Sequence, residues 1–522
     1  MLKDECLRQQ LPHLIQNFHI QQVFYHPGHN NRPGHLLVHT ANYHEAVQFS
    51  KLKWVKKMHA KKEVLLHFAG TSRLQYCTER GNPFVPYYYE ASALIYQNPD
   101  YNHESHFTIE KKSFLKKLRR SKNAFFHDYD LLSTEARRHR KAGGDVNAFL
   151  AYHSIFSTLI HQLEGLYISP FVTDQNLHER IAYLTLYLPE LQRLFVKKSA
   201  KKYCLIEIVE AAALPGAADG ELYLDIDMLP ALEQAAEALY VLVEQRYKIM
   251  KRGIHFPYVG GVVAKKVDLK ESLLGQAIGV ITKIASPEEI YLFHTKETAA
   301  VPEKTAAHFL FYVLLLGKGI GNDKLLSIQQ SVADVTQKQC TVVAIAHSRY
   351  FIQDNLFSLQ TFFKGIIQPE NRIYTSDSFH PMLHWQASHT VYYSDLGILQ
   401  PRARRYSEQF QMLLAHRSAE NTEALYLLFA YAFTHLLRTY LYLQLFSYQP
   451  NQLCTYSLWN LAVYSNPKLE KMEFLFNQLS DQFYKDIDAH LRFAHRSNRV
   501  DNAELEIMEQ ILNVLVEKTE ED

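Results

Sequence analysis

Cysteine is scarce in this sequence of 522 residues, which contains only five. An odd number of cysteines at scattered positions does not form the disulfide framework that stabilises many small secreted proteins. We therefore expect reduced thiols in a cytoplasmic protein. The five cysteines are Cys6, Cys77, Cys204, Cys340 and Cys454.

Long apolar runs without ionisable residues are also missing. The N-terminal segment MLKDECLRQQ has no apolar core of the kind found in signal peptides. The longest apolar stretch, from Ala424 to Phe446, is long enough to span a bilayer, but it contains His435, Arg438 and four tyrosines. Ionisable residues are rare in membrane-spanning segments. We therefore expect a buried helix of a bundle and no membrane partner.

A large net charge is absent as well, since 56 Lys and Arg against 54 Asp and Glu give +2. The balance is uneven, however. Residues 1–123 contain 18 Lys and Arg and 9 Asp and Glu, a net +9 (18 − 9), so residues 124–522 sum to −7 (2 − 9). A basic first quarter indicates an anionic partner. The length itself predicts about two to four globular domains.

Two helical hairpins are present, at residues 147–195 and 423–474. In the first, apolar residues recur at steps of three and four between Phe149 and Tyr167, which places them on one helical face. Asn147 is a suitable N-cap for this helix, and Asn176 for the next one. Ser169-Pro170 separates the two helices, because proline lacks an amide donor.

The rest of the chain can be laid out as a tandem duplication around these hairpins. Residues 289–292 match residues 22–25, and His347-Ser348-Arg349-Tyr350 follows Thr71-Ser72-Arg73-Leu74 by 276 residues, the offset that also relates Ala148 to Ala424. Two features that share one offset, together with matching strands in the same order, favour whole-domain duplication. The expected strands are 22–25, 35–39, 64–69, 94–96, 289–292, 309–316 and 341–346. The expected helices include 1–18, 43–60, 107–141, 228–250, 269–284 and 323–337.

We therefore predict an α+β, predominantly helical protein in which a small α/β module followed by an up-down helical bundle occurs twice. The predicted domain limits are 1–106, 107–284, 285–395 and 396–522.

The hairpins resemble the HEPN family of helical domains. That family often reads Ala-Phe-x-Leu-His-Gln-x-x-Glu, a Gly-Tyr-x-Pro loop, then Thr-His-x-Leu. Here the first hairpin has Ala148-Phe149, His153, Ser169-Pro170 and Gln175-Asn176-Leu177, and the second has Phe429, Ser447-Tyr448-Gln449-Pro450 and Gln452-Leu453. The family's Gln, its Glu and its second His are not present.

The α/β modules, which directly precede these bundles, resemble diverged nucleotidyltransferase domains. That family carries Gly-Ser in a first loop and an Asp-x-Asp pair on the next strand, where the carboxylates bind two metal ions. This chain has Gly28-His29 before the strand at 35–39, and His294-Thr295 before the strand at 309–316, with no carboxylate on either strand. The resemblance thus implies two modules that are inactive in nucleotidyl transfer, and no cofactor.

RNase activity is the enzymatic alternative. Active HEPN nucleases carry an Arg and a His with four to six residues between them, so that a cation and a general base meet at a phosphate. Arg120 and His127 fit this spacing. Such a pair also arises by chance on a solvated helical face.

Three further patterns have a chemical and a structural interpretation. His26, His29, His35 and His39 could bind a metal or form a polar loop and edge strand. The loop Gly317-Lys318-Gly319-Ile320-Gly321 could hold a phosphate, or it is a permissive connection capped by Asn322 or Asp323. Asp225 and Asp227 are expected to cap the helix that follows them.

Basic runs in the first quarter are the candidate nucleic-acid contacts. We predict a non-enzymatic nucleotide- or RNA-associated binding protein, and the resemblance implies a bacterial protein of stress or defence systems. The alternatives are a metal-independent RNase and a helical scaffold that binds another protein. The candidate binding residues are Lys53, Lys56, Lys57, Lys61, Lys112, Lys116 and Arg119.

Overall fold

The computed structural model describes most of the chain. The described residues are 5–27, 34–61, 64–79, 81–101, 111–167, 176–214, 224–252, 272–298, 308–377, 379–387, 395–418, 420–447, 453–480, 482–492 and 502–520. They form two compact units. The first unit comprises Met1–Val263 with Phe379–His384, and the second comprises Ala264–Ser378 with Trp385–Asp522.

A four-stranded sheet lies near the start of the first unit, in the order β3-β2-β1-β4. Strand β2 (Gly34–Thr40) pairs in parallel with β3 (Val64–Gly70), whereas β1 (Ile20–His26) pairs antiparallel with β2 and with β4 (Leu94–Gln97). The parallel strands β2 and β3 are buried along their whole length, as expected for strands covered on both faces.

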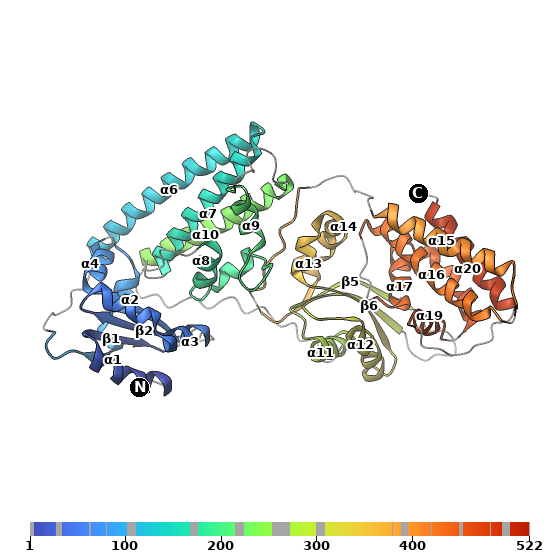
Figure 1. Cartoon of the computed structure of the whole chain (residues 1–522), viewed down its shortest axis with the longest axis horizontal. Coiled ribbons are helices and arrows are strands. Elements are labelled where there is room, and N and C mark those ends of the chain that lie inside the picture. Colours follow the sequence, from blue (N-terminus) through green and yellow to red (C-terminus); the bar gives the residue numbers. More distant parts are fainter. Residues whose placement is uncertain are drawn as a thin grey trace. The chain divides into compact units, whose positions relative to one another are not determined.

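Helices cover both faces of this sheet (Figure 1). Alternate strand residues such as Val23 and Val38 pack with α1 (Glu5–Asn17), α2 (Tyr43–Lys51) and α3 (Lys53–Lys61). Their neighbours Phe24 and Leu37 face the other way and pack with α4 (Thr71–Glu79) and α5 (Phe84–Tyr88). The sheet therefore separates α1, α2 and α3 from α4 and α5.

The helical part of the first unit centres on α7 (Asp145–Tyr167), which packs against α6 (Lys111–Lys141) and α10 (Leu229–Arg252). These three long helices lie side by side, with α8 (Leu177–Leu184) and α9 (Cys204–Ala211) beside them (Figure 1). Short 3-10 helices, η2 (Pro189–Leu194) and η3 (Ile226–Met228), precede α9 and α10.

A short segment from much later in the chain completes the first unit. Residues Phe379–His384 belong to it although the chain on both sides belongs to the second unit. The Met382 amide donates to the Arg193 carbonyl oxygen at 2.8 Å, and the Arg193 guanidinium lies 5.2 Å from the centroid of the Phe379 ring. Leu383 and His384 are buried. We call this segment the strap.

Among the described residues, the first element of the second unit is α11 (Leu273–Ala285), and the unit contains a sheet of the same design, in the order β7-β6-β5-β8. Strand β6 (His308–Leu316) is parallel to β7 (Cys340–His347), and β5 (Glu289–Thr298) is antiparallel to β6 and to β8 (Arg372–Thr375). The sheet is accompanied by α12 (Asn322–Val335), α13 (Arg349–Asp354) and α14 (Leu356–Ile366).

The helices of the second unit follow its sheet. Helix α16 (Thr422–Leu445) packs against α15 (Leu396–Leu414), α17, α19 and α20. The remaining helices are α17 (Thr455–Ser465), η5 (Pro467–Met472), α18 (Glu473–Leu479), α19 (Phe483–Leu491) and α20 (Asn502–Glu520). Among the described residues, no helix combines the length and the apolar character that crossing a membrane requires.

The two sheets also correspond in detail. Gln22, Val23 and Phe24 pair with β4 just as Glu289, Ile290 and Tyr291 pair with β8, and both ladders shift register after the second of these residues. The expected equivalence of residues 22–25 and 289–292 is thus confirmed in strand position. The prediction of a mixed, mainly helical α+β protein is confirmed as well.

Several sequence-based details were wrong. The helix expected over 43–60 is two helices, because Leu52 adopts an extended conformation at the end of α2. Asn147 lies inside α7, which begins at Asp145. His294-Thr295 lies within β5, not in a loop.

Two helix starts also differ, and one helix lies elsewhere. Asp227 lies in η3, ahead of α10. The N-cap of α12 is Gly321 rather than Asn322 or Asp323. Helix α11, which we expected at the end of the first bundle, packs against α12 in the second unit. The Ser169-Pro170 break lies outside the described residues.

Candidate functional site

The exposed face of α6 brings together most of the predicted site residues. Because successive residues of an α-helix are about 100° apart, Lys112, Lys116, Arg119, Arg120 and His127 fall within an arc of about 100°. All five side chains are exposed. The opposite face buries Phe114, Leu118 and Phe125 in the first unit. We call the five exposed residues the basic stripe.

Charge is distributed unequally along α6. Residues 111–127 carry seven Lys and Arg and no Asp or Glu, whereas residues 128–141 carry three acidic residues. In the second half, Arg140 pairs with Glu233 of α10 at 2.8 Å. In the part of the chain that the structure describes, no ion pair involves Lys112, Lys116, Arg119 or Arg120. The first half of α6 thus presents positive charge that no carboxylate of the described chain neutralises.

The lysines of α3 lie on a different surface. Lys53 and Lys57 are exposed, and the side chains of Lys56 and Lys61 are outside the described ones. Helix α3 covers one face of the sheet. Helix α6 begins on the other face beside α4, where Lys117 Nζ donates to the Thr78 carbonyl oxygen at 3.3 Å. The two basic runs therefore do not form one continuous patch.

Arg120 and His127 share a helical face but are separated by two turns, about 10 Å along the axis. Among the described residues, neither side chain has a hydrogen bond or ion pair, so no neighbour orients an imidazole as a general base. Their arrangement supports electrostatic contact with an anion and supplies no preorganised acid–base pair.

Of the predicted histidines, His35 belongs to a buried polar cluster with His67 and Tyr187. His35 Nδ1 lies 3.2 Å from His67 Nε2, which lies 2.9 Å from the hydroxyl of Tyr187. Burial, reinforced by the nearby His26, lowers the pKa of His35 to about 3, so this imidazole is neutral. His26 donates to the Tyr88 carbonyl oxygen at 2.8 Å. The cluster thus joins the sheet to the segment after α8.

Metal binding by these histidines finds no support in the described residues. His39 forms a hydrogen bond with Thr71, with 2.9 Å between Nε2 and Oγ1. His29 lies outside the described part of the chain. Within that part, no three His, Cys, Asp or Glu side chains are grouped closely enough to hold a metal ion.

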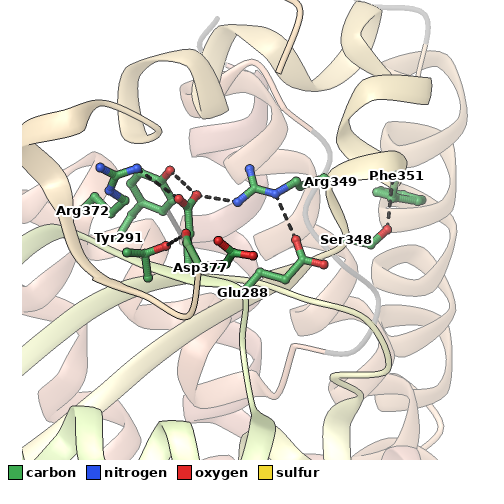
Figure 2. A network of polar contacts seen from close by, with 9 residues as sticks. Glu288, Tyr291, Ser348, Arg349, Phe351, Arg372 and Asp377 are labelled. Carbon is green, nitrogen blue, oxygen red and sulfur yellow. Dashed lines mark hydrogen bonds and ion pairs between the residues drawn. The ribbon is translucent and has the colours of Figure 1, made fainter. Parts of the chain in front are cut away.

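An ion-pair network that the sequence reasoning missed lies at one edge of the second sheet (Figure 2). Buried Arg349 donates to Glu289, and its Nε donates to Glu288 at 2.9 Å. Arg372 Nη1 donates to Glu289 Oε1 at 3.1 Å, and the Tyr291 hydroxyl donates to the other oxygen of that carboxylate at 2.6 Å (Figure 2).

Electrostatics explain why this network stays ionised. Burial alone would raise the pKa of Glu289, but Arg349, the Tyr291 hydrogen bond and Arg372 outweigh it and lower that pKa. The signal in the sequence was the acidic pair Glu288-Glu289 at the start of an apolar strand. At the corresponding strand positions, the first unit has Gln22 and Leu94 in place of Glu289 and Arg372, so the network is specific to the second unit.

The glycine-rich loop 317–321 lies at the same edge and is a tight connection. The Gly317 amide donates to the His347 carbonyl oxygen at 3.0 Å. A Cβ atom at Gly317 would lie 2.9 Å from Ile320 Cδ1 and 3.3 Å from Pro287 Cα, and Gly319 has a φ of +67°. These constraints account for Gly317 and Gly319 without a phosphate.

Comparisons of the chain with family models, with curated proteins and with solved structures found no match.

Proposed function

We propose that this chain binds RNA without cleaving it, through the basic stripe of α6. The observation that carries the proposal is the run of exposed Lys112, Lys116, Arg119 and Arg120 on one helical face, without a carboxylate partner in the described chain. A surface of that kind is complementary to a phosphate backbone.

The dimensions of the stripe suit several consecutive phosphates. From residue 112 to residue 127 it extends about 22 Å along the helix axis. Lysine and arginine contacts to phosphates fix position and carry little sequence information. The proposed binding is therefore strongly salt-dependent and weakly sequence-specific.

The repeated architecture supports the wider proposal that each unit is a nucleotidyltransferase-like module followed by a HEPN-like bundle. Both units place a sheet of the same strand order before a long buried helix, α7 or α16. Neither β2 nor β6 carries a carboxylate. An adaptor role in RNA binding fits modules without the metal-binding pair.

The test removes three charges from the stripe. We expect the triple variant Lys112→Gln/Lys116→Gln/Arg119→Gln to bind a single-stranded RNA more weakly than the parent in fluorescence anisotropy. The plot of log affinity against log salt should become shallower by about 2, because each single-strand phosphate contact contributes about 0.7 to that slope.

Two controls separate local contacts from general charge. Arg402→Gln/Arg404→Gln/Arg405→Gln removes the same charge from the exposed face of α15 and should leave the slope unchanged. Lys53→Gln/Lys57→Gln tests the α3 surface separately. Equal losses in the α6 and α15 variants would contradict a specific stripe, and no RNA binding by the parent would favour a protein scaffold. RNA cleavage that His127→Ala abolishes would establish the RNase alternative instead.

A further inference from the structure

A cavity of about 210 Å³ lies within the second unit, between its sheet and its helices. Lys296 of β5 and His308 of β6 line it from the sheet. Tyr456 of α17, Glu473 of α18 and Tyr484 of α19 line it from the helices. Ligand pockets for drug-sized molecules usually have volumes of about 300–1,000 Å³, so this cavity suits something smaller than a nucleotide.

Aromatic rings form much of the helical wall. The Phe476 and Phe483 rings stack with centroids 4.6 Å apart. The Tyr484 ring stands edge-on to Phe483 at 5.4 Å and to Tyr456 at 5.4 Å. All four residues line the cavity. Aromatic faces attract organic cations, and clusters of such rings recognise alkylammonium groups.

The charges around the cavity leave one carboxylate without a cation. Lys296 Nζ is paired with Glu470 at 2.8 Å. Glu473 Oε1 accepts a hydrogen bond from the indole of buried Trp459 at 3.0 Å, which fixes its position. In the described part of the chain, no Lys, Arg or His forms an ion pair with Glu473.

The phenols do not compensate this charge. Burial raises the pKa of Tyr456 to about 12, and the nearby Glu473 adds to this effect, whereas a hydrogen bond with Thr341 opposes it. Burial also raises the pKa of Tyr484, and the adjacent Glu473 carboxylate adds to that effect. Both phenols are therefore neutral at physiological pH and add no charge to the cavity.

We infer that this cavity binds a small organic ammonium ion, with the positive nitrogen opposite Glu473 and its alkyl groups against the aromatic rings. The charge, the ring surfaces and the volume select the same class of ligand. An anionic ligand would meet an uncompensated carboxylate, and a polynucleotide would not fit. This site is in the second unit and is independent of the stripe on α6.

Choline chloride is a suitable probe, because its neutral isostere, 3,3-dimethylbutan-1-ol, has the same shape without the charge. In isothermal titration calorimetry with the full chain, we expect choline to bind and the alcohol to bind at least tenfold more weakly. Glu473→Gln should weaken choline binding at least tenfold. This change keeps an oxygen acceptor for Trp459, so the fold should be retained, which circular dichroism can verify.

Matched variants define the roles of charge and ring. Glu506→Gln, at an exposed position of α20, should leave choline binding unchanged. Tyr484→Phe keeps the ring and should bind choline like the parent, whereas Tyr484→Leu should weaken it. The inference is overturned if choline does not bind up to the millimolar range, if the alcohol binds equally well, or if Glu473→Gln has no effect.

Discussion

At the scale of single residues, the Arg349–Glu289 pair is a buried ion pair at the end of the second sheet. Both side chains are almost completely buried, at 7% and 5% exposed, so each charge depends on the other. The Glu289 pKa lies below its ordinary value of 4.5. The stabilisation is therefore present above that value and is lost as the pH falls through the lowered pKa of the folded state.

We predict that Arg349→Met destabilises the second unit by about 3–5 kcal/mol, because it leaves the Glu289 charge buried without its main partner. Urea unfolding in a Trp54→Phe background measures this, since Trp385 and Trp459 then report on the second unit. The control Arg404→Met breaks the exposed Arg404–Glu408 pair and should cost less than about 1 kcal/mol. Equal effects of the two changes would show that the buried network adds nothing specific.

At the scale of elements, two glycines with positive φ lie close to α6, one packed against it and one directly after it. Gly81 has a φ of +73°, and a Cβ atom there would lie 2.9 Å from Lys117 Cβ. Gly143, just after α6, has a φ of +70° but no atom within 4 Å of such a Cβ. The two positions share the backbone cost of a left-handed conformation and differ in available space.

We predict that Gly143→Ala costs about 1–2 kcal/mol, from the conformation alone. Gly81→Ala should cost clearly more, because α6 must also shift away from the α4–α5 connection. Thermal unfolding of the two variants compares them directly. If the two variants lose the same stability, the close approach of Gly81 to Lys117 does not constrain the position of α6.

Periodicity in the sequence predicted most elements, because burial of one face leaves a regular spacing of apolar residues. It failed where a single residue changes the backbone, as at Leu52, where the apolar spacing continues across a break between α2 and α3. The basic stripe was predictable from spacing on one helix. The network of Glu289, Arg349 and Arg372 was not, because it depends on the pairing of β5 with β8 and on a helix start far away in the sequence.

At the scale of the whole molecule, the strap makes the first unit depend on residues of the second half. Leu383 is buried in the first unit, whereas the neighbouring Met382 side chain is 57% exposed. Hydrogen exchange can report on each unit separately, through peptides from β2 and α7 or from β6 and α16.

We predict that Leu383→Ala destabilises the first unit by about 2–3 kcal/mol, as expected for loss of a buried leucine. Faster exchange should therefore occur in peptides of β2 and α7, far from position 383 in the sequence. Met382→Ala keeps the backbone hydrogen bond to Arg193 and should leave exchange unchanged. Faster exchange confined to β6 and α16 would contradict the assignment of the strap to the first unit.

The strap also sets an order of events during synthesis. The first unit otherwise ends at Val263, yet it is complete only when His384 has been made, 121 residues later (384 − 263). At about 5–20 residues per second, the ribosome needs about 6–24 s for that distance. The nascent first unit therefore lacks the strap until the entire sheet of the second unit has been translated. During that interval, the surface that later contacts Leu383 and His384 is accessible to chaperones.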